Sequence, residues 1–134
     1  MITWVRPHVL ARSSRPGYAG EGGVPVTADE VDRWLGEARA LGVRSILCLL
    51  ADDQLAYYTA LPSGLLGRYR SSGFAVGHVP VRDLQTPPLS SHEVNEVGRI
   101  FDALPKPVLV HCSAGIDRTG AAIAHILSRL HPSD

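Results

Sequence analysis

The amino-acid sequence predicts an α/β fold: a single domain with a mainly parallel central sheet flanked by helices. Three short apolar runs, at 43–51, 74–81 and 107–111, are typical of strands that are buried on both faces. Segments with the apolar spacing of amphipathic helices separate these runs, and this alternation indicates βαβ crossovers. The chain has 134 residues, which is enough for one hydrophobic core and too few for two.

The N-terminal part is predicted to hold one strand, one loop and one helix. Residues 3–5, "TWV", can form a short strand, whereas 10–23 are rich in Gly, Pro, Ser and Arg and are expected to form an irregular loop. A helix is predicted from Thr27 to Gly42, because Thr27 and Glu30 have the spacing of a capping box and Gly42 stops the apolar pattern.

Three further helical segments lie among the strands. Residues 53–71 have helical spacing in two pieces, interrupted by Pro, Ser and Gly. The segment 90–104 begins with a second capping box, formed by Ser90 and Glu93. A last helix is predicted over 118–130, directly after the strand at 107–111 and its following loop.

Composition excludes several classes of function. The formal net charge is zero, so nothing indicates nucleic acid or an anionic membrane as a partner. The N-terminus has no apolar core of a signal peptide and no run is long enough to span a bilayer, so we expect a cytoplasmic protein. The two cysteines and six histidines have no metal-ligand spacing, and we expect no metal or cofactor. The sequence does not indicate the oligomeric state.

Two loops follow buried strands and are expected to face one crevice, because ligands of parallel sheets bind beyond the carboxyl ends of the strands. The first is 82–88, "RDLQTPP", and the second begins within "HCSAGIDRTG" at 111–120. The second loop joins a strand to a helix N-terminus, where unpaired N–H groups and the helix dipole create an anion site. Gly115 and Gly120 allow the backbone to curl around a phosphate, and Arg118 can donate to two of its oxygens.

The same surroundings make Cys112 a candidate nucleophile, because donors that attract phosphate also stabilise a thiolate. Thr119 is close enough in sequence to donate a hydrogen bond to that sulfur, and His111 is expected to orient the loop through its ring nitrogens. The alternative is a buried strand-end cysteine beside a glycine that packs a helix. That alternative gives no reason for Arg118, Thr119 and Gly120 to occur together.

The segment "HCSAGIDRTG" resembles the active-site signature of the cysteine-dependent protein tyrosine phosphatases, especially the compact dual-specificity branch. The resemblance implies a dual-specificity-phosphatase-like fold, a phosphocysteine formed on Cys112, and assistance from Thr119 when that intermediate breaks down. It also implies a phosphate site made by the Arg118 side chain and the main-chain amides of Ser113, Ala114, Gly115, Ile116, Asp117 and Arg118.

The resemblance also calls for a general acid on a loop upstream of the cysteine, often in a Pro-x-x-Asp setting. Asp83 in "HVPVRDLQTPP" has that position, although an isolated loop aspartate is more often a turn former. Asp117 is expected to point outward, because an anion inside the cradle would repel a phosphate. On this interpretation 1–134 is a single phosphatase domain, either a minimal one or one that lacks the C-terminal helices of the family.

The expected substrate is a phosphorylated protein or peptide, with phosphotyrosine first and phosphoserine or phosphothreonine second. Phosphoinositides or small phosphate esters are alternatives, but related enzymes that accept phosphoinositides commonly have lysine at the position of Ile116. A rhodanese-like sulfurtransferase would not need Asp83, and a non-catalytic phosphate-binding module would not need the cysteine.

Arg12 and Arg15 either border the crevice or are solvated loop arginines. Cys48 is expected to be a small core residue, with a disulfide to Cys112 as a minor alternative.

Overall fold

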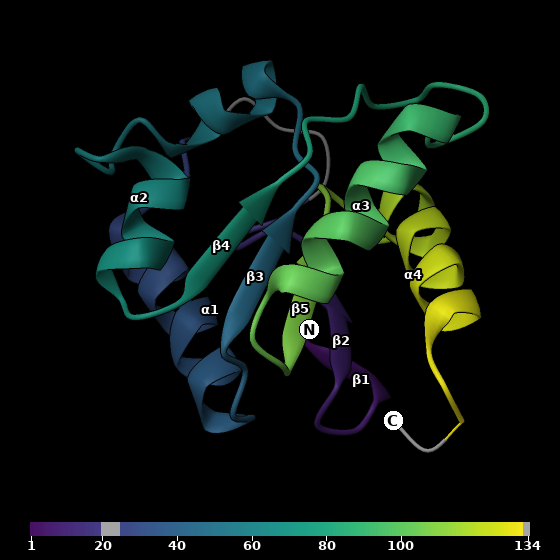
Figure 1. Ribbon diagram of the computed structural model, residues 1–134. Helices are drawn as coiled ribbons and strands as arrows, with labels where there is room; N and C mark the ends of the chain where they lie inside the picture. Colours follow the sequence, from purple (N-terminus) through teal and green to yellow (C-terminus); the bar gives the residue numbers. More distant parts are fainter. Residues whose placement is uncertain (20–24, 133–134) are drawn as a thin grey trace.

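The computed structural model describes residues 1–19 and 25–132, which form a five-stranded sheet between two layers of helices (Figure 1). The strand order is β1-β2-β5-β3-β4. All neighbouring pairs are parallel except β1 and β2, which are antiparallel. The strands are β1 Thr3–Arg6, β2 Leu10–Ser13, β3 Ser45–Cys48, β4 Ala75–His78 and β5 Val108–His111.

Two helices cover each face of the sheet (Figure 1). One face packs against α1 and α2, and the other packs against α3 and α4. The helices are α1 Ala28–Ala40, α2 Gly64–Ser71, α3 Ser91–Ala103 and α4 Asp117–Arg129, with a 3-10 helix, η1 Asp52–Tyr58, between β3 and α2. Both predicted capping boxes are present, at Thr27 with Glu30 and at Ser90 with Glu93. These caps set where α1 and α3 begin.

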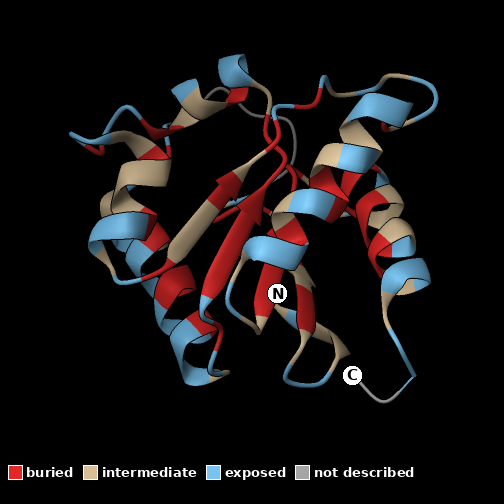
Figure 2. Ribbon diagram, in the orientation of Figure 1, coloured by how far each residue is buried: buried red, intermediate tan, exposed pale blue. Residues whose placement is uncertain are grey.

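Burial follows the layers, with the inner strands β2, β3 and β5 and the inner sides of the helices buried and the outer sides of the helices exposed (Figure 2). The expectation that the segment 74–81 is buried on both faces is wrong for β4, because this strand lies at the edge of the sheet and only its Gly77 is buried. The central strands β3 and β5 are buried along their whole length, as expected for a parallel sheet covered on both faces. No helix among the residues that the structure describes has the length and apolar character needed to cross a bilayer.

The expectation of an irregular loop over 10–23 is wrong in its first part. Residues Leu10–Ser13 form β2, which lies inside the sheet between β1 and β5. The polar composition that follows concealed this strand, since its partner Val108–His111 lies far away in the sequence. Residues 20–23 of the expected loop lie outside the described part of the chain.

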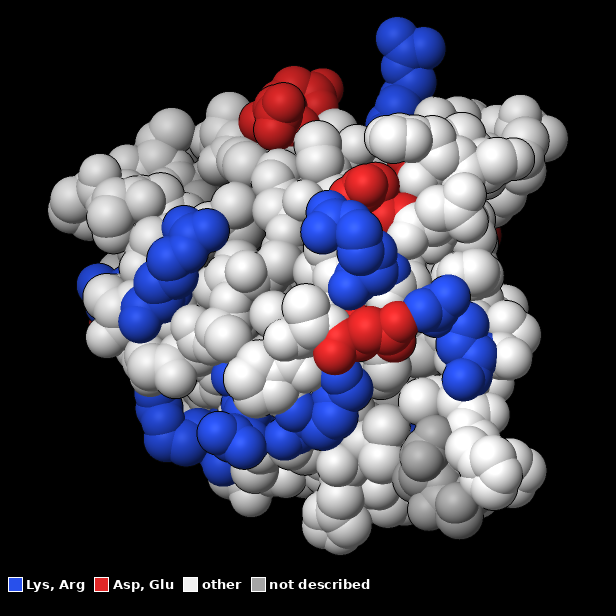
Figure 3. All heavy atoms as spheres, viewed as in Figure 1, with Lys and Arg blue, Asp and Glu red and all other residues white. Residues whose placement is uncertain are grey.

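The parallel strands all end at the same edge, which is where α4 begins (Figure 1). The loops after β5 and β4 therefore meet there, as the strand pattern predicts. The positive side chains in view gather mainly at the opposite end, where α1 ends (Figure 3). On the face in view, few positive side chains lie near the carboxyl ends of the strands, so an anion site there would depend mainly on local groups.

Candidate active site

The segment from Cys112 to Ile116 turns from the end of β5 into α4. Gly115 makes this turn possible, because its φ is +80° and a Cβ there would lie 2.6 Å from the main-chain oxygen of Ser13. The loop therefore packs directly on the end of β2. The N-cap residue of α4, Ile116, has no side chain that could cap the helix, so the N–H groups of its first turn can donate to an anion.

Cys112 lies at the base of this turn, beside a pocket of about 260 Å³. Its Sγ accepts a hydrogen bond from the Gly115 amide at 3.3 Å. The pocket walls come from the loop after β4 and from the loop before α4; they are Asp83, Leu84, Cys112, Ser113, Ala114, Ile116, Asp117 and Arg118. The topology thus brings together the two segments that the sequence singled out.

Arg118 is only 2% exposed although it carries a charge. Its Nη1 donates to Gln54 Oε1 at 2.7 Å and to main-chain oxygens of Val81 at 2.9 Å and Leu49 at 3.4 Å. These acceptors fix the plane of the guanidinium. Because Nη1 is engaged, Nη2 and Nε are the pair of donors that a phosphate can use.

Asp83 lies across the pocket and approaches Arg118, with 3.4 Å between Oδ2 and Nη2. The same Oδ2 accepts from Gln54 Nε2 at 3.2 Å, and Oδ1 accepts from the Leu84 amide at 3.0 Å. The carboxyl side chain is 32% exposed, so it can be reached from solvent as well as from the pocket. A proton donor and acceptor is therefore available near the sulfur and the guanidinium.

Two arginines from the end of β2 support the loop from outside the pocket. Arg15 is buried; its amide donates to the Ser113 oxygen at 2.8 Å and its Nε donates to Ser113 Oγ at 3.1 Å. Its guanidinium also lies 4.5 Å from the centre of the Tyr57 ring. Arg12 Nη2 donates to the Gly115 oxygen at 2.8 Å. Neither is a solvated loop arginine, and neither lines the pocket beside Cys112.

His111 is fully buried behind the loop. Its Nδ1 lies 3.0 Å from the Cys112 oxygen and its Nε2 lies 2.9 Å from Tyr69 Oη. A carbonyl oxygen can only accept, so Nδ1 carries the proton and Nε2 accepts from the tyrosine. Burial lowers the pKa of His111 to about 4. The ring is therefore neutral at pH 7. Its two hydrogen bonds hold the backbone at the start of the loop.

The side chains of Thr119 and Asp117 do not form the hydrogen bonds that were expected of them. Thr119 Oγ1 is buried and has no hydrogen-bond partner within the described part of the chain, so the expected bond from this hydroxyl to the sulfur is not formed in this state. Asp117, expected to turn outward and to bond backbone or an arginine, is exposed but also lines the pocket, and among the described residues its side chain has no such bond.

Comparison with known proteins identifies the family. Residues 23–131 match the family described as "Polymorphic toxin system, DSP-PTPase phosphatase". The chain belongs to this family of DSP-PTPase phosphatases. The match leaves out β1 and β2, although Ser13 and Arg15 at the end of β2 contact the signature loop of this phosphatase. The sulfurtransferase alternative is set aside by the family assignment.

Solved structures share the fold of this phosphatase. A DUF442 protein from Shewanella putrefaciens CN-32, described as a phosphatase, is 19% identical with a TM-score of 0.66, over 96% of this chain and 71% of that one. Kinase-associated phosphatase with its catalytic cysteine replaced by serine is 18% identical with a TM-score of 0.64, over 92% and 69%. TpbA from P. aeruginosa is 23% identical with a TM-score of 0.54, over 96% and 64%. Among curated proteins, no sequence matches this one.

The second cysteine of this phosphatase lies on the other side of the sheet. Cys48 pairs in register with His111, so alternation along β5 turns Cys112 to the opposite face. Cys48 accordingly packs in the core under α1 and α2, and Cys112 packs in the core under α3 and α4. Burial raises the pKa of Cys48 to about 12, so it remains a neutral thiol. A disulfide between the two cysteines does not fit this arrangement.

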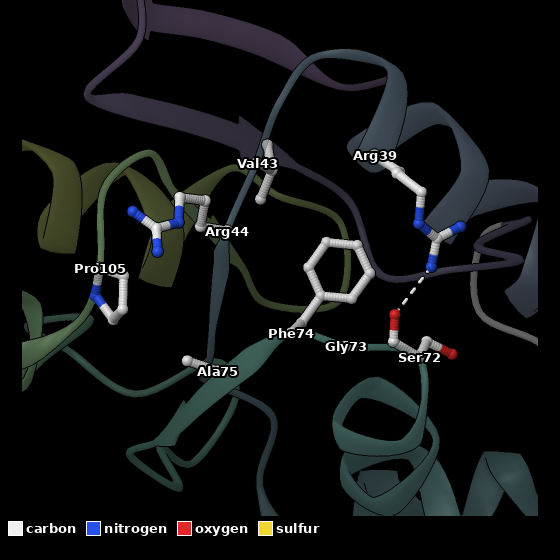
Figure 4. Close-up of a pocket in the computed structure, with 8 residues that line it drawn as sticks. All are labelled: Arg39, Val43, Arg44, Ser72, Gly73, Phe74, Ala75 and Pro105. Atoms are coloured by element: carbon white, nitrogen blue, oxygen red, sulfur yellow. Dashed lines mark hydrogen bonds between the residues drawn. The ribbon is translucent and has the colours of Figure 1, made fainter.

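A separate hollow of about 290 Å³ lies at the opposite end of the sheet (Figure 4). Arg39 there donates to the Ser72 oxygen at 2.8 Å and lies over the Phe74 ring, so its guanidinium is engaged with the protein itself. This hollow has no carboxylate, thiol or imidazole in its lining. Within 1–19 and 25–132, no group of three or more His, Cys, Asp and Glu could hold a metal ion.

The buried imidazole predicts a pH dependence of stability. The folded pKa of His111 is about 4 and an unfolded histidine titrates near 6.5, so between these values the unfolded chain binds the extra proton. The free energy of unfolding should therefore fall as pH decreases from about 6.5 to about 4, by on the order of 3 kcal/mol from this residue. Urea denaturation at several pH values checks this.

Carboxylates also titrate in this window, so the control is His111→Asn, which keeps a side-chain donor without an ionisable ring. The parental protein should lose more stability than this variant between pH 7 and pH 5. Parallel pH profiles of the two proteins would contradict the role of burial at His111.

Proposed function

We propose that this phosphatase hydrolyses phosphotyrosine, and secondarily phosphoserine or phosphothreonine, in proteins or peptides through a phosphocysteine intermediate. One observation carries the proposal: Cys112, Arg118 and Asp83 line the same pocket of about 260 Å³. This supports the assignment of Cys112 as the nucleophile, Arg118 as the bidentate phosphate ligand and Asp83 as the proton donor.

In the first step the Cys112 thiolate attacks phosphorus while the bond from phosphorus to the ester oxygen breaks. Arg118 and the amides of 113–118 hold the three non-bridging oxygens. Asp83 in its protonated form transfers its proton to the leaving oxygen, so the alcohol or phenol departs neutral. The products of this step are a phosphocysteine and a carboxylate at Asp83.

In the second step water attacks phosphorus and the bond from sulfur to phosphorus breaks. The Asp83 carboxylate takes a proton from the attacking water, and inorganic phosphate is released. The sulfur departs as a thiolate, stabilised by the Gly115 amide that already contacts it. The unpaired Thr119 hydroxyl supplies a further donor once the loop adjusts, because a buried hydroxyl without a partner is costly.

The rim of the pocket favours an aromatic substrate. Leu84 is 88% exposed and Ile116 is 65% exposed, and both line the pocket. Exposed apolar side chains are unfavourable in water, and a phenyl ring bound between them removes their apolar surface from solvent, which favours binding. An apolar rim also offers no positive charge that could bind further phosphate groups of a substrate.

Solved relatives support both the proposal and its alternative. A serine variant of TpbA from P. aeruginosa, 22% identical over 89% of this chain and 57% of that one with a TM-score of 0.51, was solved in complex with phosphotyrosine. The core domain of a PP-IP phosphatase from S. cerevisiae, 19% identical over 95% and 64% with a TM-score of 0.56, was solved with citrate. The second candidate is therefore a small-molecule phosphomonoesterase, which the rim of Leu84 and Ile116 disfavours.

The test compares a phosphotyrosine peptide, the same peptide with phosphoserine, and p-nitrophenyl phosphate. The parental enzyme should prefer phosphotyrosine to phosphoserine. Asp83→Asn should lower kcat/KM for the phosphotyrosine peptide by about 10²-fold, because the phenolate then leaves without a proton. The loss with p-nitrophenyl phosphate should be less than about tenfold, because that leaving group needs little protonation.

Asp53→Asn is the matched control, since Asp53 is an exposed acid in η1 and lies in the neighbouring hollow rather than beside Cys112. It should keep parental rates on all three substrates. Equal losses for good and poor leaving groups in Asp83→Asn would argue against the acid role. A preference for phosphoserine would argue against the aryl substrate.

A further inference from the structure

Gln54 contacts both the arginine and the acid of the site, although it belongs to no sequence motif. It is the third residue of η1 and is 9% exposed. Its Oε1 accepts from Arg118 Nη1 at 2.7 Å, and its Nε2 donates to Asp83 Oδ2 at 3.2 Å. One carboxamide therefore bridges the group that binds phosphate and the group that supplies the proton.

The orientation of this amide is fixed by its neighbours. A guanidinium only donates and a carboxylate only accepts. If the amide were turned over, its N–H groups would face Arg118 and its oxygen would face Asp83, which makes two repulsive contacts. The Nε2 donor of Gln54 must therefore point to the acid.

Phosphate binding changes what holds Asp83. In the free enzyme its Oδ2 has two partners outside its own loop, Gln54 Nε2 and Arg118 Nη2. A phosphate that takes Nη2 of Arg118 removes the second of these, because the phosphate dianion competes for the same donor. The contact with Gln54 is independent of this competition, since Gln54 uses a different nitrogen of Arg118.

We propose that Gln54 is a positioning residue that keeps Asp83 beside the leaving oxygen after phosphate has displaced the ion pair between Asp83 and Arg118. This inference rests on the proposed function. Nε2 of Gln54 only donates, and Oδ2 of Asp83 can accept from it whether the carboxyl is charged or neutral. Gln54 can therefore hold the acid before and after its proton has been transferred.

Gln54 also has a structural contact from which this role must be separated: its Oε1 accepts from the Ala51 amide at 3.2 Å. Gln54→Glu separates the two, because glutamate still offers an acceptor to Ala51 and Arg118 but replaces the donor toward Asp83 by a negative oxygen. Other charged or titratable groups line the two hollows that share Asp83; they are Asp52, Asp53, Tyr57, Arg82, Cys112, Asp117 and Arg118. All of these are unchanged in the variant.

The first readout is the ¹³C signal of the Asp83 side-chain carboxyl, followed by NMR as a function of pH. In Gln54→Glu this signal should change at a higher pH than in the parental protein, because a like charge replaces a donor. The basic limb of the pH profile of kcat/KM should move in the same direction. An unchanged titration would show that the side chain at residue 54 does not contact Asp83, and it would overturn the proposal.

The second readout is the dependence on leaving group in Gln54→Met, which removes the three polar contacts of the side chain at similar volume. We expect kcat for the phosphotyrosine peptide to fall about tenfold and kcat for p-nitrophenyl phosphate to change little. The control is Gln85→Met, because Gln85 lies in the same loop as Asp83 but donates to the Pro88 oxygen and to Glu93 Oε1. Equal effects of Gln54→Met and Gln85→Met on both substrates would also overturn the proposal.

The two proposals fail in different ways. The carboxyl titration is measured on the protein alone and reports on the contact between Gln54 and Asp83 whether or not any ester is hydrolysed. Failure of the proposed function would instead appear in the parental protein, as turnover that does not depend on Cys112.

Discussion

Cys112→Ser is expected to lower kcat/KM for an aryl phosphate by at least about 10⁴-fold while phosphate-ester binding persists. A serine hydroxyl is almost entirely protonated at neutral pH, so the variant lacks an anionic nucleophile. The Arg118 side chain and the loop amides are retained, and the Gly115 amide that contacts the sulfur can donate to the serine oxygen instead. Steady-state kinetics and isothermal titration with a phosphotyrosine peptide measure the two properties separately.

Cys48→Ala is the matched control, because this thiol packs on the other face of the sheet and its raised pKa keeps it neutral. It should cost some stability and leave the rate unchanged. If Cys112→Ser kept activity within tenfold of the parental enzyme, the phosphocysteine mechanism would be wrong. If the parental protein bound the peptide without hydrolysing it, a phosphate-binding module would be the better description.

Arg118→Lys should lower kcat/KM by about 10²- to 10³-fold, although the charge is conserved. One ammonium group cannot bond the main-chain oxygens of Leu49 and Val81 and also offer two parallel donors to phosphate. Inhibition by inorganic phosphate should weaken by at least about tenfold, because the loss includes ground-state binding. Kinetics with p-nitrophenyl phosphate and added phosphate measure both effects.

Arg12→Lys is the control, since Arg12 contacts the Gly115 oxygen from outside the pocket and does not line it. It should reduce activity far less than Arg118→Lys. Parental phosphate inhibition in Arg118→Lys would show that the cradle consists of main-chain amides alone and would contradict the assignment of Arg118 as a phosphate ligand.

Local patterns in the sequence are sufficient to predict most helices and strands of the fold. The capping boxes at Thr27 and Ser90 mark the starts of α1 and α3 through contacts only three residues apart, which a sequence pattern can contain. The strand β2 escapes prediction because its residues, LARS, run directly into a polar segment rich in Gly, Pro and Arg. Its burial comes from β1 and β5, and a non-local pairing of this kind leaves little trace in a short segment.

The same distinction applies to the site. The segment 111–120 is contiguous, so its residue types and spacing indicate phosphate chemistry directly. Gln54 could not be found in this way, because its contacts with Asp83 and Arg118 depend on three loops that meet only in the folded sheet. The place of Arg15 is not predictable from the sequence, since its burial against Ser113 and Tyr57 follows from β2 entering the sheet.

The placement of the two sulfurs on opposite sides of the sheet also determines how peroxide damage would proceed. A sulfenic acid on Cys112 could not be captured by Cys48, because strands β3 and β5 lie between the two side chains. The sulfenic acid can then be converted to a reversible form only by condensation with a nearby main-chain nitrogen or by reaction with a thiol from solution. Without either, further oxidation to the sulfinic acid would be irreversible, because Cys48, the other cysteine of the chain, cannot act as a resolving cysteine for Cys112.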